Sequence, residues 1–139
     1  MKYYYVDLGL RNARLNFRQL EENHIMENII YNELIIRGFN VDVGCIEDFE
    51  RDKNGKTIRK HLEVDFIATN VSNCYYIQSA LSIDSEDKKS QETKSLNKIK
   101  NSFKKIIIIK DDIIPWHDND GILYIGIEQF LLEENAINL

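Results

Sequence analysis

Two acids and a neutral amide lie in neighbouring apolar stretches of the sequence. Glu63 and Asp65 are two residues apart in LEVDFIAT (62–69), and a strand here would project both carboxylates from one face. Gln78 follows in CYYIQSAL (74–81). Mg²⁺ prefers carboxylate, carbonyl and water oxygens. The pattern therefore predicts a candidate metal site of Asp65, Glu63 and Gln78, and its alternative is a pair of solvated acids on an exposed sheet face.

Other kinds of chemistry have little support in the sequence. No GxxxxGK[ST] or GxGxxG loop is present, which argues against a phosphate-binding loop in this chain. His24, His61 and His117 belong to no known catalytic frame, and no serine has an evident base partner. Cys45 and Cys74 are too few and too isolated for a disulfide framework or a zinc site, so we expect two reduced thiols.

The candidate residues need a sheet to bring them together, and the first half of the chain predicts one. Apolar residues at helical spacing over 22–37 predict a helix, and Gly38 follows it where a left-handed residue often ends a helix. Alternating or continuous apolar stretches predict strands at 39–49, 57–69 and 74–81. The Asn54-Gly55 pair predicts a hairpin between the first two strands. We expect an antiparallel meander.

The second half predicts helices that cover this sheet and further strands that widen it. An amphipathic helix is expected over 86–103, with an apolar stripe of Leu96, Ile99 and Phe103. The isoleucine run in 104–110 predicts a central buried strand. A loop at 115–121, a short strand at 122–126 and a terminal helix at 127–134 complete the prediction. The fold class is α/β, with a mixed central sheet flanked by helices.

Composition and charge limit the class of protein. The chain has 139 residues, 43% hydrophobic and 29% charged, as expected for one folded domain. Its net charge of −5 argues against a polycation that coats nucleic acid. No apolar run is long enough to span a bilayer, and the N-terminus does not resemble a signal peptide. We therefore expect a soluble, cytoplasmic protein.

The order helix, three strands, helix, strand, with acids on the first helix and second strand, resembles the PD-(D/E)xK phosphodiesterase superfamily. The restriction endonucleases and archaeal Holliday-junction resolvases belong to it. Asp65 matches its central aspartate, Gln78-Ser79-Ala80 matches its (D/E)-x-K triplet, and Glu27 matches its helix acid. The resemblance implies a restriction-endonuclease-like core in which Asp65, Gln78 and Glu27 are the candidate catalytic residues.

A closer resemblance covers nearly the whole chain. The stretches VDLGLRNA, MENIIYNELIIRG and EVDF with YIQSA look like the C-terminal DUF4143 domain of bacterial and archaeal AAA+-type ATPases. In that family an ATPase domain with a P-loop precedes this domain, so the ATPase domain is the implied partner. On this interpretation residues 1–20 are a lead segment that links to an upstream module, and residues 21–139 form the nuclease-like domain.

The sequence departs from the superfamily at the triplet. The motif lysine is replaced by Ala80 and the preceding acid by the neutral Gln78. Loss of such an electrostatic group typically costs about a hundred- to a thousand-fold in rate. Lys88, Lys89 and Lys94 are possible substitutes, with Lys94 the best placed, although lysines that solvate a helix face are the simpler interpretation.

Three hypotheses for function follow. The first is a degenerate nuclease-like domain that binds or regulates without catalysis of its own. The second is a Mg²⁺-dependent DNA phosphodiesterase with an atypical site, in which Trp116, Tyr75 and Tyr76 are candidates to stack on bases. The third is a protein-interaction domain, which the net charge of −5 favours over a nucleic-acid binder.

Overall fold

A computed structural model of the protein describes Tyr4 and residues 22–139. The predicted lead segment 1–20, apart from Tyr4, lies outside the described residues. The elements in chain order are α2 (Glu22–Ile36), β1 (Asn40–Arg51), β2 (Thr57–Thr69), β3 (Cys74–Ala80), α3 (Glu86–Asn97), β4 (Lys104–Ile109), β5 (Trp116–His117), β6 (Leu123–Gly126), α4 (Ile127–Leu132) and the 3₁₀ helix η1 (Glu134–Asn138).

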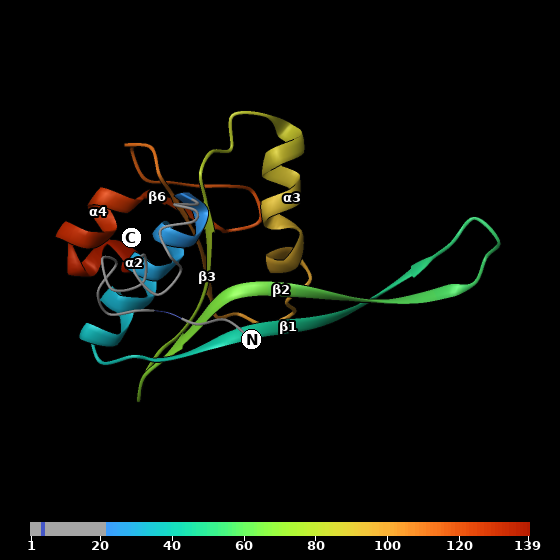
Figure 1. Ribbon diagram of the computed structural model, residues 1–139, viewed down its shortest axis with the longest axis horizontal. Helices are drawn as coiled ribbons and strands as arrows, with labels where there is room; N and C mark the ends of the chain where they lie inside the picture. Colours follow the sequence, from blue (N-terminus) through green and yellow to red (C-terminus); the bar gives the residue numbers. More distant parts are fainter. Residues whose placement is uncertain (1–3, 5–21) are drawn as a thin grey trace, which may run out of the picture.

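The strands form one mixed six-stranded sheet in the order β1-β2-β3-β4-β6-β5. β1, β2 and β3 are antiparallel neighbours, which confirms the predicted meander. β3, β4 and β6 are parallel to one another, with α3 in the crossover from β3 to β4. The predicted α/β class with a mixed sheet flanked by helices is therefore correct (Figure 1).

Helices cover both faces of the sheet, and the central strand is apolar on both sides. Ile106 and Ile108 of β4 pack on the face that carries α2 and α4, whereas Ile107 and Ile109 pack on the face that carries α3. All four are at most 2% exposed. This burial explains why the isoleucine run is continuous: a central strand covered on both faces has no polar side.

The end of α2 is joined to the C-terminal elements through Arg37. Its guanidinium donates to the carbonyl oxygens of Phe130 and Glu134 and pairs with Glu33 at 3.0 Å. It also lies 4.6 Å from the centroid of the Phe130 ring. Gly38 follows with φ of +86°, the left-handed conformation predicted for the residue after this helix.

The β1–β2 hairpin projects beyond the rest of the molecule (Figure 1). We call residues 45–63 the arm. β2 pairs with β3 only from Phe66 to Thr69, so the arm is a two-stranded ribbon. Its turn contains the predicted Asn-Gly pair, with Gly55 at φ +79° and the Asp52 carboxylate accepting from the amides of Asn54 and Lys56 at 2.8 Å.

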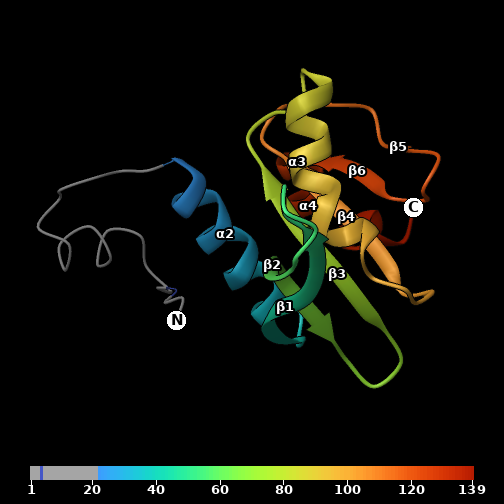
Figure 2. The same ribbon diagram turned by 90° about the vertical axis from the view of Figure 1, so that its right-hand side faces the viewer.

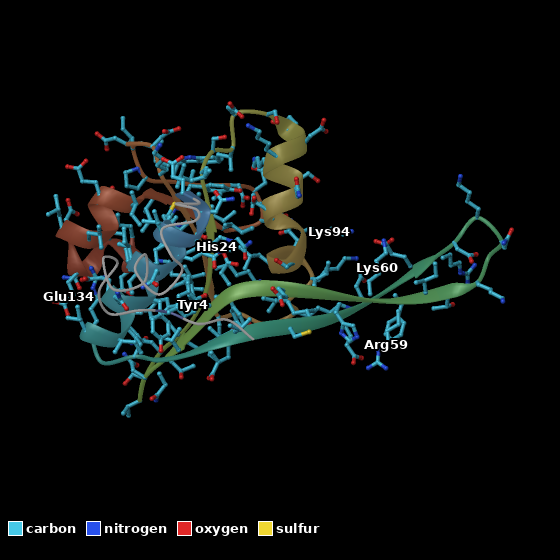
Figure 3. All side chains as sticks on the ribbon, in the orientation of Figure 1. Tyr4, His24, Arg59, Lys60, Lys94 and Glu134 are labelled. Carbon is cyan, nitrogen blue, oxygen red and sulfur yellow. The ribbon has the colours of Figure 1, made fainter. Side chains whose placement is uncertain are left out.

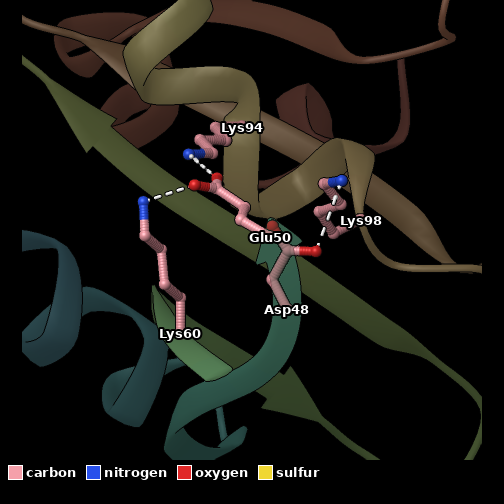
Figure 4. Close-up of polar contacts among 5 residues, drawn as sticks. All are labelled: Asp48, Glu50, Lys60, Lys94 and Lys98. Carbon is pink, nitrogen blue, oxygen red and sulfur yellow. Dashed lines mark hydrogen bonds and ion pairs between the residues drawn. The ribbon is translucent and has the colours of Figure 1, made fainter. Parts of the chain in front are cut away.

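One face of the arm is attached to α3 by ion pairs (Figure 4). Glu50 accepts from Lys60 across the hairpin and from Lys94 of α3 at 3.1 Å, and these two bonds lower the pKa of Glu50 to about 2. Asp48 pairs with Lys98, the residue directly after α3, at 3.4 Å. In Figure 3, Lys60 points towards α3, while Arg59 projects from the opposite face of the ribbon.

Two sequence predictions in the second half are wrong in detail. α3 ends at Asn97, so Phe103 lies outside the helix and is 51% exposed, while Leu96 is fully buried. The predicted loop 115–121 contains the short strand β5, whose Trp116 pairs with Tyr124 of β6 and stacks on its ring at 4.2 Å. β5 is only two residues long and is stabilised by one aromatic contact, so it produces no periodic pattern that the sequence could reveal.

Within the described residues, no helix is both long enough and apolar enough to cross a membrane.

Candidate functional site

A cavity of about 400 Å³ opens at the carboxyl end of β3, between α2 and α3. Figure 2 shows that these two helices lie on opposite sides of the sheet. Ligands of open α/β sheets commonly bind outside the carboxyl ends of the strands. The lining residues are Asn23, Met26, Glu27, Asp65, Gln78, Ser79, Ala80, Leu81, Ser82, Lys88, Gln91 and Glu92.

Asp65 and Gln78 meet in this cavity, as their positions on adjacent strands predict. The registered pairing of β2 with β3 ends at Phe66 and Ile77, and side chains continue the contact beyond it. The amide of Asp65 donates to Oε1 of Gln78 at 3.1 Å. Oδ2 of Asp65 accepts from both the amide and the hydroxyl of Ser79 at 2.9 Å. Asp65 is 7% exposed, and its carboxylate thus holds the two strands together where their ladder stops.

Glu63 does not join this site, contrary to the prediction that it shares a face with Asp65. Asp42 pairs with Ile67 but Gly44 pairs with Val64, so β2 contains an extra residue at this point. Such a bulge interrupts the alternation of side chains between the two faces. Val64 accordingly packs on the α3 side and Phe66 on the α2 side, although they are two residues apart. Glu63 is exposed and does not line the cavity.

Glu92 of α3 is a cavity residue that the sequence analysis missed. Its Oε2 accepts from Nε2 of Gln78 at 3.3 Å. Burial raises the pKa of the Glu92 carboxyl, the bond from Gln78 opposes this, and the negative charge of Asp65 raises it further. Glu92 lies in a strongly polar helical segment, where the sequence predicts a solvent-exposed acid. Only the packing of α3 against β3 distinguishes it from its neighbours.

Glu27 lies where the resemblance placed it, on α2 and lining the same cavity as Asp65. Tyr4 packs beside it, with its ring stacked on Tyr31 at 4.4 Å and tilted against Phe66 at 5.6 Å. Burial and then the nearby carboxylates of Glu27 and Asp65 raise the pKa of the Tyr4 hydroxyl. Within the described residues, the cavity therefore has three carboxylates, from Glu27, Asp65 and Glu92.

No lysine takes the place of the missing motif residue among the described residues. Ala80 is 5% exposed and packs in the core on the α3 side. Lys94, the best placed by sequence position, pairs instead with Glu50 of the arm, and Lys89 lies 5.1 Å from the centroid of the Trp116 ring. Lys88 lines the cavity, but its amine pairs with Asp84 at 3.2 Å and donates to Ser82 at 3.3 Å.

The described residues at this site do not fit a divalent metal. In the part of the chain that the structure describes, no three His, Cys, Asp or Glu side chains are grouped so that they could hold a metal ion. Oδ2 of Asp65 and Oε1 of Gln78 already accept hydrogen bonds from the protein. Glu63 does not line the cavity.

Comparison with known proteins gives one informative match. No family model matches the chain, and no solved structure matches it significantly. The chain is 32% identical over 132 residues to an uncharacterized protein of Haemophilus influenzae. The match covers 95% of this chain but 29% of that relative, which is therefore more than three times as long as the matched stretch.

Proposed function

We propose that this chain is a degenerate PD-(D/E)xK nuclease-like domain of the DUF4143 type, which binds or regulates without catalysis of its own. On this proposal its sheet and helices are a restriction-endonuclease-like core. It would form the C-terminal part of a P-loop ATPase-type protein, with the ATPase domain as its partner. The greater length of the Haemophilus influenzae relative is compatible with such an arrangement.

The observation that carries the proposal is the environment of residue 80. A nuclease of this superfamily needs an amine there to position water and stabilise charge in the transition state. Ala80 contributes only a buried methyl group, and the amine of Lys88 is engaged by Asp84. Asp65 has a structural role that does not require catalysis, because its carboxylate connects β2 to β3 through Ser79.

A cleavage assay tests the proposal against the phosphodiesterase alternative. The purified chain is incubated with plasmid and branched DNA in the presence of Mg²⁺ or Mn²⁺, beside Asp65→Ala. Asp84→Ala is the matched control, because Asp84 is a 71%-exposed acid that pairs with Lys88 near the cavity. We expect no cleavage by any of the three proteins. Cleavage that Asp65→Ala abolishes and Asp84→Ala retains would overturn the proposal.

A further inference from the structure

α3 has few apolar contacts for a helix that covers part of the sheet. Leu96 is the one apolar residue among its 12 residues, and it is fully buried in the core on this side of the sheet. Thr93 and Ser95 are also buried, but the hydroxyl of Thr93 donates to the carbonyl oxygen of Lys89 in the same helix at 2.9 Å. A helix of this length is marginal in water without tertiary packing. Polar contacts therefore contribute much of what holds α3 in place.

Two of these polar contacts come from the arm and reach the C-terminal end of α3 (Figures 1 and 4). Glu50 accepts from Lys94 in the last turn of the helix at 3.1 Å, and it also pairs with Lys60 across the hairpin. Asp48 pairs with Lys98 at 3.4 Å. The C-terminus of a helix carries a partial negative charge, which would repel both acids if the two lysines of this region were absent. The ion pairs therefore join two surfaces that would otherwise repel each other.

The two acids differ in how strongly each needs its lysine. Asp48 is 9% exposed, and its Oδ2 accepts no hydrogen bond from the described residues. Loss of the partner of a buried charge is strongly unfavourable, whereas an exposed ion pair contributes little by itself. Glu50 is more exposed, but its carboxylate bridges two lysines. We call Asp48, Glu50, Lys94 and Lys98 the latch, because they join the arm to the end of α3.

The same helix forms one wall of the cavity at the carboxyl end of β3. Glu92 and two other residues of α3 line the cavity, and Glu92 accepts from Gln78 of β3 at 3.3 Å. Ile83 before the helix and Ile99 after it pack against the core. Opening of α3 between these two apolar anchors would remove this wall and leave the sheet intact. Lids on binding sites are drawn from the least stable elements of a protein, and α3 has the sparse apolar packing of such an element.

We propose that α3 is a lid on the cavity, which opens by local unfolding as one unit and which the latch holds closed. A displacement of the arm that separates Glu50 from Lys94, or Asp48 from Lys98, lowers the free energy of this opening. The arm, which projects beyond the rest of the molecule, thereby controls access to the cavity (Figure 1). The inference rests on the proposed function in treating the cavity as a binding site.

Amide hydrogen exchange of the full chain, resolved by residue, tests this lid. Lys94→Ala/Lys98→Ala leaves the buried Asp48 without its cation and should speed exchange at residues 89–93, beside the cavity, by at least about tenfold. Alanine favours a helix more than lysine does, so faster exchange would report the lost contacts with the arm and not a weaker helix. Glu50→Gln should speed exchange at the same amides about threefold.

Glu47→Gln is the matched control for Glu50→Gln, because it removes the same charge from the same strand. Glu47 pairs with Arg59, which projects from the face of the ribbon opposite to α3 (Figure 3). Its replacement should leave exchange of α3 at the wild-type rate. Salt gives an independent measurement, since wild-type α3 should exchange faster at about 1 M than at about 0.01 M salt.

Three results would overturn the inference: unchanged exchange of α3 in Lys94→Ala/Lys98→Ala, faster exchange confined to the last turn of the helix, or an equal rise at the amides of β4, which would mean global unfolding. Circular dichroism checks that the double variant is folded. If it is not, equal rates in Glu50→Gln and Glu47→Gln would overturn the inference instead. Metal-dependent DNA cleavage would overturn the proposed function whatever the exchange result, whereas unchanged exchange overturns only the lid.

Discussion

Replacement of Asp65 by alanine should destabilise the protein, because its carboxylate is a structural link between two strands. Oδ2 accepts from the amide and the hydroxyl of Ser79, both at 2.9 Å. Hydrogen bonds to a charged group contribute about 1.5–3 kcal/mol each. Ser79 is half-buried, so water replaces part of this loss, and removal of a buried carboxylate recovers its desolvation cost. We expect Asp65→Ala to lower the free energy of unfolding by about 2 kcal/mol.

Urea unfolding at neutral pH measures this change. With a slope of about 2 kcal/mol per molar, the midpoint should fall by about 1 M urea. Asp65→Asn keeps one acceptor oxygen for Ser79 and should lose about 1 kcal/mol. Asp84→Ala, at an exposed ion pair, should change the free energy of unfolding by less than about 1 kcal/mol.

The opposite result would have a clear meaning. Acids that are kept for catalysis often reduce stability, so their removal makes the folded protein more stable. If Asp65→Ala unfolds at the same or a higher urea concentration than wild type, the structural role of Asp65 is wrong. The presence of Asp65 in a chain that has Ala80 in place of the motif lysine would then not be explained by stability. That result would support the phosphodiesterase alternative.

Two further predictions concern stability. Arg37→Ala should lower the free energy of unfolding by about 3 kcal/mol, because the 6%-exposed Arg37 side chain pairs with Glu33 and its loss also leaves two carbonyls without their donor. Arg59→Ala removes an exposed ion pair and should lower the free energy of unfolding by less than about 1 kcal/mol. Urea unfolding measures both variants, and equal losses of stability in Arg37→Ala and Arg59→Ala would contradict this reasoning. Because the pKa of Glu92 is higher in the folded state, the folded protein binds this proton more tightly than the unfolded chain does. The resulting stabilisation of the folded state is complete below the ordinary pKa of 4.5 and is lost as the pH rises through the folded-state pKa. Glu92→Gln should therefore gain stability relative to wild type as pH rises from 4.5 to neutrality, and thermal unfolding across that range with no relative gain would refute the buried placement of Glu92.

Much of the framework could be predicted because its signals are local. The periodicity of 22–37, the Asn-Gly pair and the isoleucine run each report the environment of a few consecutive residues. The structure confirms α2, the meander and a central β4. Phe103 was misplaced because continued apolar spacing does not reveal where a helix ends.

The candidate site was predicted in part. Asp65, Gln78 and Glu27 do line one cavity, as their positions suggested. Glu63 was wrongly grouped with them because a single bulge in β2 shifts the register, and nothing in LEVDFIAT signals it. Glu92 was missed because its role depends on packing with residues far from it in the chain.

The sequence by itself determined the order of the helices and of the longer strands, the acid and amide on adjacent strands, and the absence of an amine at residue 80. These features follow from residue identity and short-range periodicity. Only the tertiary structure decided which carboxylates share the cavity, which lysines are engaged elsewhere, and that the β1–β2 hairpin projects as a ribbon. Those outcomes depend on strand register and on the packing of α3, which are set by contacts between distant parts of the chain.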